Sequence, residues 1–141
     1  MVSVKTYSAL VKEFDKRASV AVENVAKVVC DKLRECINEQ YYNDPDFYPN
    51  IYKRTYAFLE SAMYEMMGMD TAIVGVNSSS MHYKNGFSGT QVVEWAAQSM
   101  HGAEYYKTST EPFWNKFIQW ADNNVPQLLK SELKKQGFTI K

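Results

Sequence analysis

The chain has 141 residues, and its sixteen basic side chains balance sixteen acidic ones. A protein without net charge lacks the long-range field that attracts nucleic acid or an anionic membrane, so we expect no sequence-specific nucleic-acid partner. Its longest apolar stretches, such as residues 20–22 and 72–74, fall far short of the roughly 18 residues that span a bilayer. The length fits one domain over residues 1–141, and we expect no membrane-spanning segment.

The first predicted element is a long amphipathic helix over about residues 8–41. No proline precedes Pro45 and no glycine precedes Gly68, and the β-branched run 20–29 is the weakest part of the pattern. A helix of about 34 residues extends about 50 Å, whereas a compact chain of this size is on the order of 37 Å across. One end is therefore expected to overhang the molecule or to meet a neighbour. The apolar positions recur mostly at spacings of three and four: Leu10, Phe14, Ala18, Ala21, Val25, Val28 or Val29, Leu33 and Ile37.

A connector and a second helix are predicted next. Residues 41–49 combine four aromatic side chains with two prolines and two aspartates, a composition typical of an ordered turn. Asp44 and Asp46 flank Pro45 and lack the ligand alternation of a calcium loop, so we interpret them as a solvated acidic turn. The second helix is predicted over residues 51–67, where Gly68 ends it.

A small antiparallel sheet is predicted over about residues 71–84. Residues 71–76 are rich in β-branched side chains, and three serines then favour a turn before a return strand at 81–83. Residues 91–100 suit one or two buried helical turns.

The last predicted helix covers about residues 111–136. Pro126 is expected to kink or split it, because proline removes a backbone hydrogen bond and clashes with the preceding turn. Gly137 is expected to end it, and residues 138–140 to form an edge strand. The order of helices and sheet predicts an α+β fold.

Residues for catalysis or for a cofactor are sparse. The nearest metal-binding set is Glu94, His101 and Glu104, whose shared helical face Gly102 is expected to break. Neither a Gly-x-Ser-x-Gly elbow nor a phosphate-binding glycine loop is present. Cys30 and Cys36 lie too far apart on one helix to bridge each other. We therefore expect no catalysis, no cofactor and no bound metal.

Aromatic and methionine side chains are more abundant than a core of this size needs. Tyrosine and methionine both adapt to irregular protein contacts. Packing against the long helix accounts for part of the set, and the remainder indicates a partner. The candidate interface residues are Tyr41, Tyr42, Phe47, Tyr48, Tyr52 and Tyr56, and Met63, Met66, Met67 and Met69 follow them.

Residues 48–59, Tyr-Pro-Asn-Ile-Tyr-Lys-Arg-Thr-Tyr-Ala-Phe-Leu, resemble a helix of the small neck and tail-completion proteins of tailed bacteriophages. The likeness extends to residues 92–97 with His101-Gly102, and to residues 125–137. The resemblance implies a virion subunit, assembled in the host cytoplasm, that joins head and tail or completes the tail. It also implies a homo-oligomeric ring, with a hexamer among the expected forms, that contacts other neck or tail proteins and performs no catalysis.

Two other functions remain open at the level of the sequence. One is a cytoplasmic adaptor or inhibitor that uses the tyrosine-rich segment against a single protein partner. The other is a small metal-assisted enzyme built on Glu94, His101 and Glu104.

Overall fold

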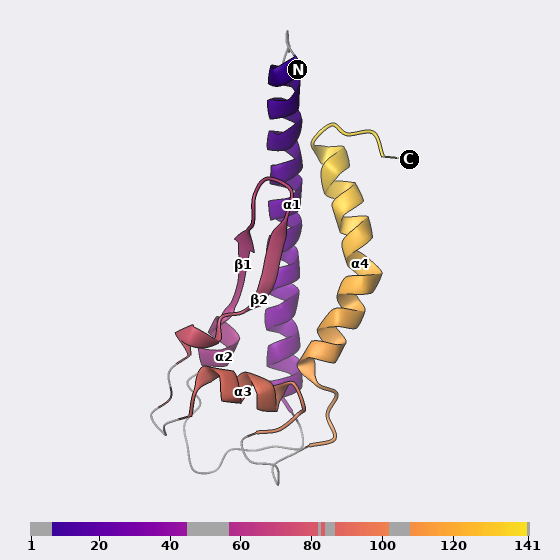
Figure 1. Cartoon of the computed structure of the whole chain (residues 1–141). Coiled ribbons are helices and arrows are strands. Elements are labelled where there is room, and N and C mark those ends of the chain that lie inside the picture. The colour runs from indigo at the N-terminus through magenta and orange to yellow at the C-terminus, as the bar shows by residue number, and fades with distance from the viewer. Residues whose placement is uncertain (1–6, 45–56, 82, 84–86, 102–107, 141) are drawn as a thin grey trace.

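The computed structural model describes residues 7–44, 57–81, 83, 87–101 and 108–140, and Figure 1 shows the arrangement of the elements. A long N-terminal helix, a two-stranded antiparallel sheet and a long C-terminal helix confirm the predicted α+β class. No helix in the described part of the chain is long and apolar enough to cross a membrane. In chain order the elements are α1 (Tyr7–Ile37), η1 (Asn38–Tyr42), α2 (Ala57–Glu60), β1 (Ala62–Met66), β2 (Ala72–Val76), η2 (Ser78–Ser80), α3 (Gly89–Ala96) and α4 (Phe113–Lys135).

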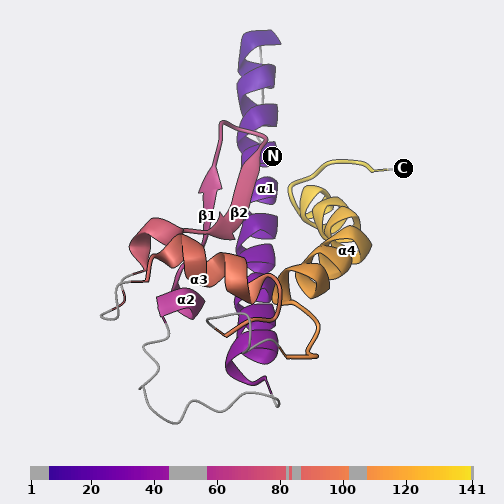
Figure 2. The same cartoon turned by 60° about the horizontal axis from the view of Figure 1, so that its bottom comes forward.

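Helix α1 is the central element of the fold, and the hairpin, α2 and α4 pack against it. It runs for 31 residues without a break through the β-branched run 20–29, and the π-helical segment η1 continues it to Tyr42. Figures 1 and 2 show the β1–β2 hairpin along one side of α1, α4 along another, and α2 and α3 near its C-terminal end. The first turns of α1 extend beyond both the hairpin and α4, so the overhang predicted from its length is present.

The core lies around the C-terminal half of α1, where it meets α2, α3 and the start of α4. Phe58 and Phe113 are fully buried, and their rings meet edge to face with centroids 5.2 Å apart. Burying a side chain of this size stabilises the fold by roughly 1.5–3 kcal/mol. The helix α1 contributes Ala21, Val25, Ala26, Val29, Cys30, Leu33, Cys36 and Ile37.

Residues 62–66 form strand β1, and the prediction that they belong to a helix over 51–67 is wrong. Residues 51–56 lie outside the described part, and α2 is a single turn of four residues. In β1, Tyr64 and its neighbours two residues away turn towards α1, while Met63 and Glu65 point outwards. Hydrogen bonding to β2 and burial against α1 outweigh the helix propensity of alanine, glutamate and methionine.

The sheet therefore lies earlier in the chain than the predicted range 71–84. Strand β2 occupies residues predicted to be extended, but its partner is β1, with Ala62 opposite Val76 and Met66 opposite Ala72. The serines of η2 form a turn of 3₁₀-helix, and the predicted return strand at 81–83 is wrong for its described residues.

Helix α3 begins two residues before the predicted range 91–100. Ser88 caps it in a capping box with Gln91, a motif that satisfies two of the free backbone N–H groups at a helix start. The helix ends at Ala96, and Ser99 follows with a positive φ of 57°.

Helix α4 confirms the long C-terminal helix and passes through Pro126 without splitting. Figure 1 shows that it bows along its length, as expected of a helix with an internal proline. Gly137 adopts a φ of +93° and turns the chain, so residues 138–140 form no strand. The ring of Phe138 instead meets Phe14 of α1, with centroids 4.8 Å apart.

Candidate protein–protein interface

Two of the six predicted interface residues, Tyr41 and Tyr42, lie in the described part of the chain; Phe47, Tyr48, Tyr52 and Tyr56 lie outside it. Tyr42 is buried, and its hydroxyl oxygen accepts a hydrogen bond from the backbone N–H of Leu59 at 3.2 Å. Tyr41 is half-buried, meets Phe58 edge to face at 5.1 Å and stacks on His101 at 4.5 Å. Both tyrosines thus take part in packing within the chain.

Beside these tyrosines lies a buried polar network centred on Asp44. One carboxylate oxygen accepts from the hydroxyl of Thr108 at 2.6 Å and lies 2.9 Å from Nε2 of His101. The other oxygen accepts from the hydroxyl of Thr110 at 2.6 Å, and the hydroxyl of Ser99 bonds to the carbonyl oxygen of Thr110. The prediction that Asp44 belongs to a solvated acidic turn is wrong, because only 2% of the residue is exposed.

The network connects three segments that are distant in the sequence. Asp44 follows η1, His101 follows α3, and Thr108 and Thr110 precede α4. An ionised carboxylate only accepts hydrogen bonds, so Nε2 of His101 is the donor in this pair. A catalytic base must reach the proton that it removes, whereas the Asp44 and His101 side chains are 0% and 2% exposed. We therefore assign the network to holding these segments together.

The metal site considered for Glu94, His101 and Glu104 does not assemble in the described residues. His101 is turned towards Asp44, Glu94 is exposed on α3, and Glu104 lies outside the described part. No group of three potential ligands is brought together in the part of the chain that the structure describes. No sequence signal pointed to Asp44 as the partner of His101, because 57 residues separate them.

The two cysteines are free and buried in the core. Burial raises the pKa of both thiols above its ordinary value, although the nearby Arg34 and Lys32 oppose that effect. A thiol that stays protonated is a poor nucleophile. Cys30 and Cys36 are thus packing residues.

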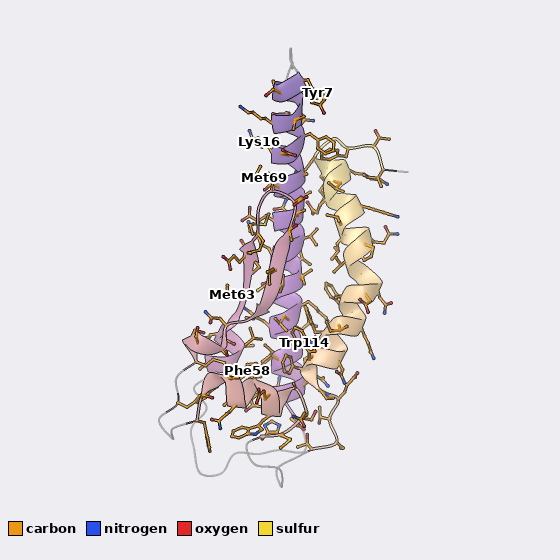
Figure 3. All side chains as sticks on the ribbon, viewed as in Figure 1. Tyr7, Lys16, Phe58, Met63, Met69 and Trp114 are labelled. Atoms are coloured by element: carbon orange, nitrogen blue, oxygen red, sulfur yellow. The ribbon has the colours of Figure 1, made fainter. Side chains whose placement is uncertain are left out.

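Eight of the thirteen large apolar side chains that are exposed in the described part of the chain lie on two surfaces, at the free end of α1 and on the β1–β2 hairpin; the others are Val20, Val28, Phe87, Trp114 and Ile118. The first, which we call the overhang stripe, consists of Tyr7, Leu10, Val11 and Phe14 at the free end of α1, where Tyr7 is 82% exposed. The second, which we call the hairpin outer face, consists of Met63, Met67, Met69 and Ile73. Figure 3 shows Tyr7 at the tip of α1 and Met63 and Met69 along the hairpin. Neither surface was named as an interface from the sequence, although the methionines were singled out.

Comparison with known proteins gives a family and nothing closer. No curated protein and no solved structure matches the chain. The model of the YomN family matches residues 6–135, which is almost the whole chain and includes both apolar surfaces. The chain belongs to the YomN family, a phage-associated family whose name comes from a gene of Bacillus phage origin.

Proposed function

We propose that the chain is a structural subunit of a tailed-phage virion that completes the tail or joins head to tail as part of a homo-oligomeric ring. The observation that carries the proposal is the pair of exposed apolar surfaces, one at the free end of α1 and one on the outside of the hairpin. A ring subunit uses two different surfaces, one for each neighbour.

Two further findings support the proposal. The family is phage-associated. Residues 48–59 resemble the motif of neck and tail-completion proteins.

The experiment is mass spectrometry on purified particles of the phage that encodes the chain, together with deletion of its gene. The proposal expects several copies of the chain in each particle, and labelled antibodies at the neck or tail end. Deletion is expected to leave filled heads and tails unjoined, or tails of abnormal length. Particles that lack the chain, or a deletion that leaves joined infectious particles, would refute the proposal.

The adaptor or inhibitor alternative makes a different prediction for the same lysates. An adaptor is expected in a stoichiometric complex with one partner and absent from purified particles. Among the described residues of the tyrosine-rich segment, Tyr42 is buried and Tyr41 packs against Phe58 and His101. This packing leaves little of the two rings for a partner, so we place the adaptor second.

A further inference from the structure

The β1–β2 hairpin carries apolar side chains on both faces. Its inner positions, among them Tyr64 and Val74, pack against α1. Its outer positions carry Met63 and Ile73 beside a single charged residue, Glu65, where a sheet with one face in water normally alternates to polar side chains. Layers of secondary structure bury their apolar faces against another layer. The hairpin outer face therefore has the composition of a surface that a second layer covers.

Gly75 indicates which kind of element packs on the hairpin outer face. It lies in the interior of β2 opposite Met63, and glycine weakens a strand at such a position. A Cβ atom added to Gly75 would meet nothing within 4 Å, so packing within the chain does not require a glycine there. A glycine in a strand often marks a place where another backbone approaches closely.

In the part of the chain that the structure describes, the overhang stripe continues the core face of α1 and is exposed, although the ring of Phe138 covers one side of Phe14. Tyr7, Val11 and Phe14 continue, at spacings of four and three, the line that reaches the buried Ala21 and Val25 farther along the helix. Figures 1 and 2 show the hairpin and α4 beside the later part of this helix, where Ala21 and Val25 are buried, and neither of them beside its first turns, where Tyr7 and Val11 are exposed. The stripe thus has the spacing of apolar side chains that is typical of a buried helix face.

Charge also matches the two surfaces. Residues 62–76 carry two acidic side chains and no basic one, whereas residues 7–20 carry three basic and two acidic side chains. Lys12, Asp15 and Lys16 are exposed on the overhang, where Arg17 pairs with Glu13, and Glu65 is exposed on the hairpin outer face. Opposite net charges favour the contact of these surfaces over that of either surface with itself.

We infer that the overhang stripe of one copy of this chain packs across the hairpin outer face of the next copy. The helix of the neighbour forms the missing layer over the sheet, next to Gly75. Every copy gives one surface and receives the other, so the contact is head to tail and closes into a ring when the rotation between copies allows it. This inference deepens the proposed function, on which the ring rests, but head-to-tail pairing itself is independent of the virion.

A two-fold dimer explains less of the structure. If two overhang stripes packed on each other, both hairpin outer faces would remain exposed. If two hairpins packed on each other, Glu65 of each copy would approach that of the other, and both stripes would remain exposed. The head-to-tail contact covers both surfaces with one kind of interface.

The experiment uses the full-length chain with one surface changed in each of two variants. Leu10→Glu places a charge in the overhang stripe, and Ile73→Glu places one in the hairpin outer face. Ile118→Glu is the matched control, because Ile118 is also an exposed isoleucine but lies on α4, outside both surfaces. Sedimentation and native mass spectrometry measure the assembly state, and circular dichroism measures folding.

The wild-type chain and Ile118→Glu are expected to assemble, while Leu10→Glu and Ile73→Glu each dissociate at least about tenfold more readily. Mixing these two variants is expected to give a one-to-one dimer, since the intact stripe of the Ile73→Glu chain fits the intact hairpin of the Leu10→Glu chain. A two-fold interface predicts no such rescue. Gly75→Val provides a second hairpin variant, expected to keep or raise monomer stability while it weakens assembly.

A wild-type chain that stays monomeric, a mixture that gives no dimer, or a Gly75→Val chain that assembles normally would each overturn the inference. These results separate it from the proposed function. If the purified chain pairs head to tail but particles lack it, the virion role fails and the interface stands. If particles contain the chain but the mixture gives no dimer, the interface fails and the virion role stands.

Discussion

Asp44→Ala tests the buried polar network most directly. The substitution removes the acceptor of hydrogen bonds from Thr108 and Thr110, each 2.6 Å long, and from Nε2 of His101 at 2.9 Å. Because Asp44 is only 2% exposed, water does not readily replace the lost carboxylate. Leaving a buried donor without its acceptor costs about 1–3 kcal/mol. The three donors together are therefore expected to cost about 3–5 kcal/mol, which is a large part of the 5–15 kcal/mol that is typical of whole domains.

The same loss can be expressed as a melting temperature. Unfolding entropy of about 2.1 cal/mol/K per residue gives about 0.3 kcal/mol/K for a chain of this length. The melting temperature is therefore expected to fall by about 10–17 °C. Thermal and urea unfolding, followed by circular dichroism and tryptophan fluorescence, measure both quantities.

A control variant and a double-mutant cycle test whether the loss of stability in Asp44→Ala comes from the buried polar network. Asp122→Ala removes an exposed aspartate of α4 and is expected to change stability by no more than about 0.5 kcal/mol. In a cycle with His101→Ala, the double variant is expected to lose less than the two single variants added together, because the residues share one interaction. A cost below about 1 kcal/mol for Asp44→Ala, or strict additivity in the cycle, would show that the network does not hold the three segments.

Three other predictions concern buried residues: two substitutions and the reactivity of the two thiols. Phe58→Ala is expected to lose about 3–5 kcal/mol in urea unfolding, because its fully buried ring meets Phe113; a loss below about 1 kcal/mol would contradict this packing. Gly89→Ala is expected to cost about 1–3 kcal/mol because its Cβ would overlap the carbonyl oxygen of Ser78; unchanged melting would refute the close approach. Cys30 and Cys36 are expected to react with a thiol reagent only as fast as the chain unfolds. Rapid labelling of the native chain would contradict the burial of the thiols. Since burial raises the pKa of both thiols, the free energy of unfolding is expected to fall as the pH rises above the ordinary thiol value of 9.0, where the unfolded chain ionises first.

The sequence predicted the helices better than the strands. Helix α1 repeats its apolar spacing over 31 residues, so a few β-branched side chains do not obscure the pattern. Strand β1 has only five residues, most of them helix formers, and its two-residue alternation is too short to be distinguished from one turn of a helix. Its conformation is decided by β2 and α1, which a local pattern does not represent.

The site was harder to predict for the same reason. Asp44 next to Pro45 has the composition of an exposed turn, and only contacts with residues 57 to 66 positions away show that it is buried. The excess of tyrosine and methionine did indicate unusual surfaces, but not which side chains form them. Tyr42 proved to be a core residue, whereas Met63 remained exposed.

The order of α1 and α4 along the chain has a consequence for synthesis. Helix α1 leaves the ribosome well before its long partner α4, and the hydrogen bond between Asn24 and Glu132 joins residues 108 positions apart. Contacts that close such long loops form late and slow folding. The face of α1 that α4 covers thus stays exposed until α4 has been synthesised, and nascent copies are most prone to associate wrongly during that interval. The demand for chaperones should accordingly depend on how fast α4 reaches α1, more than on the stability of the finished fold.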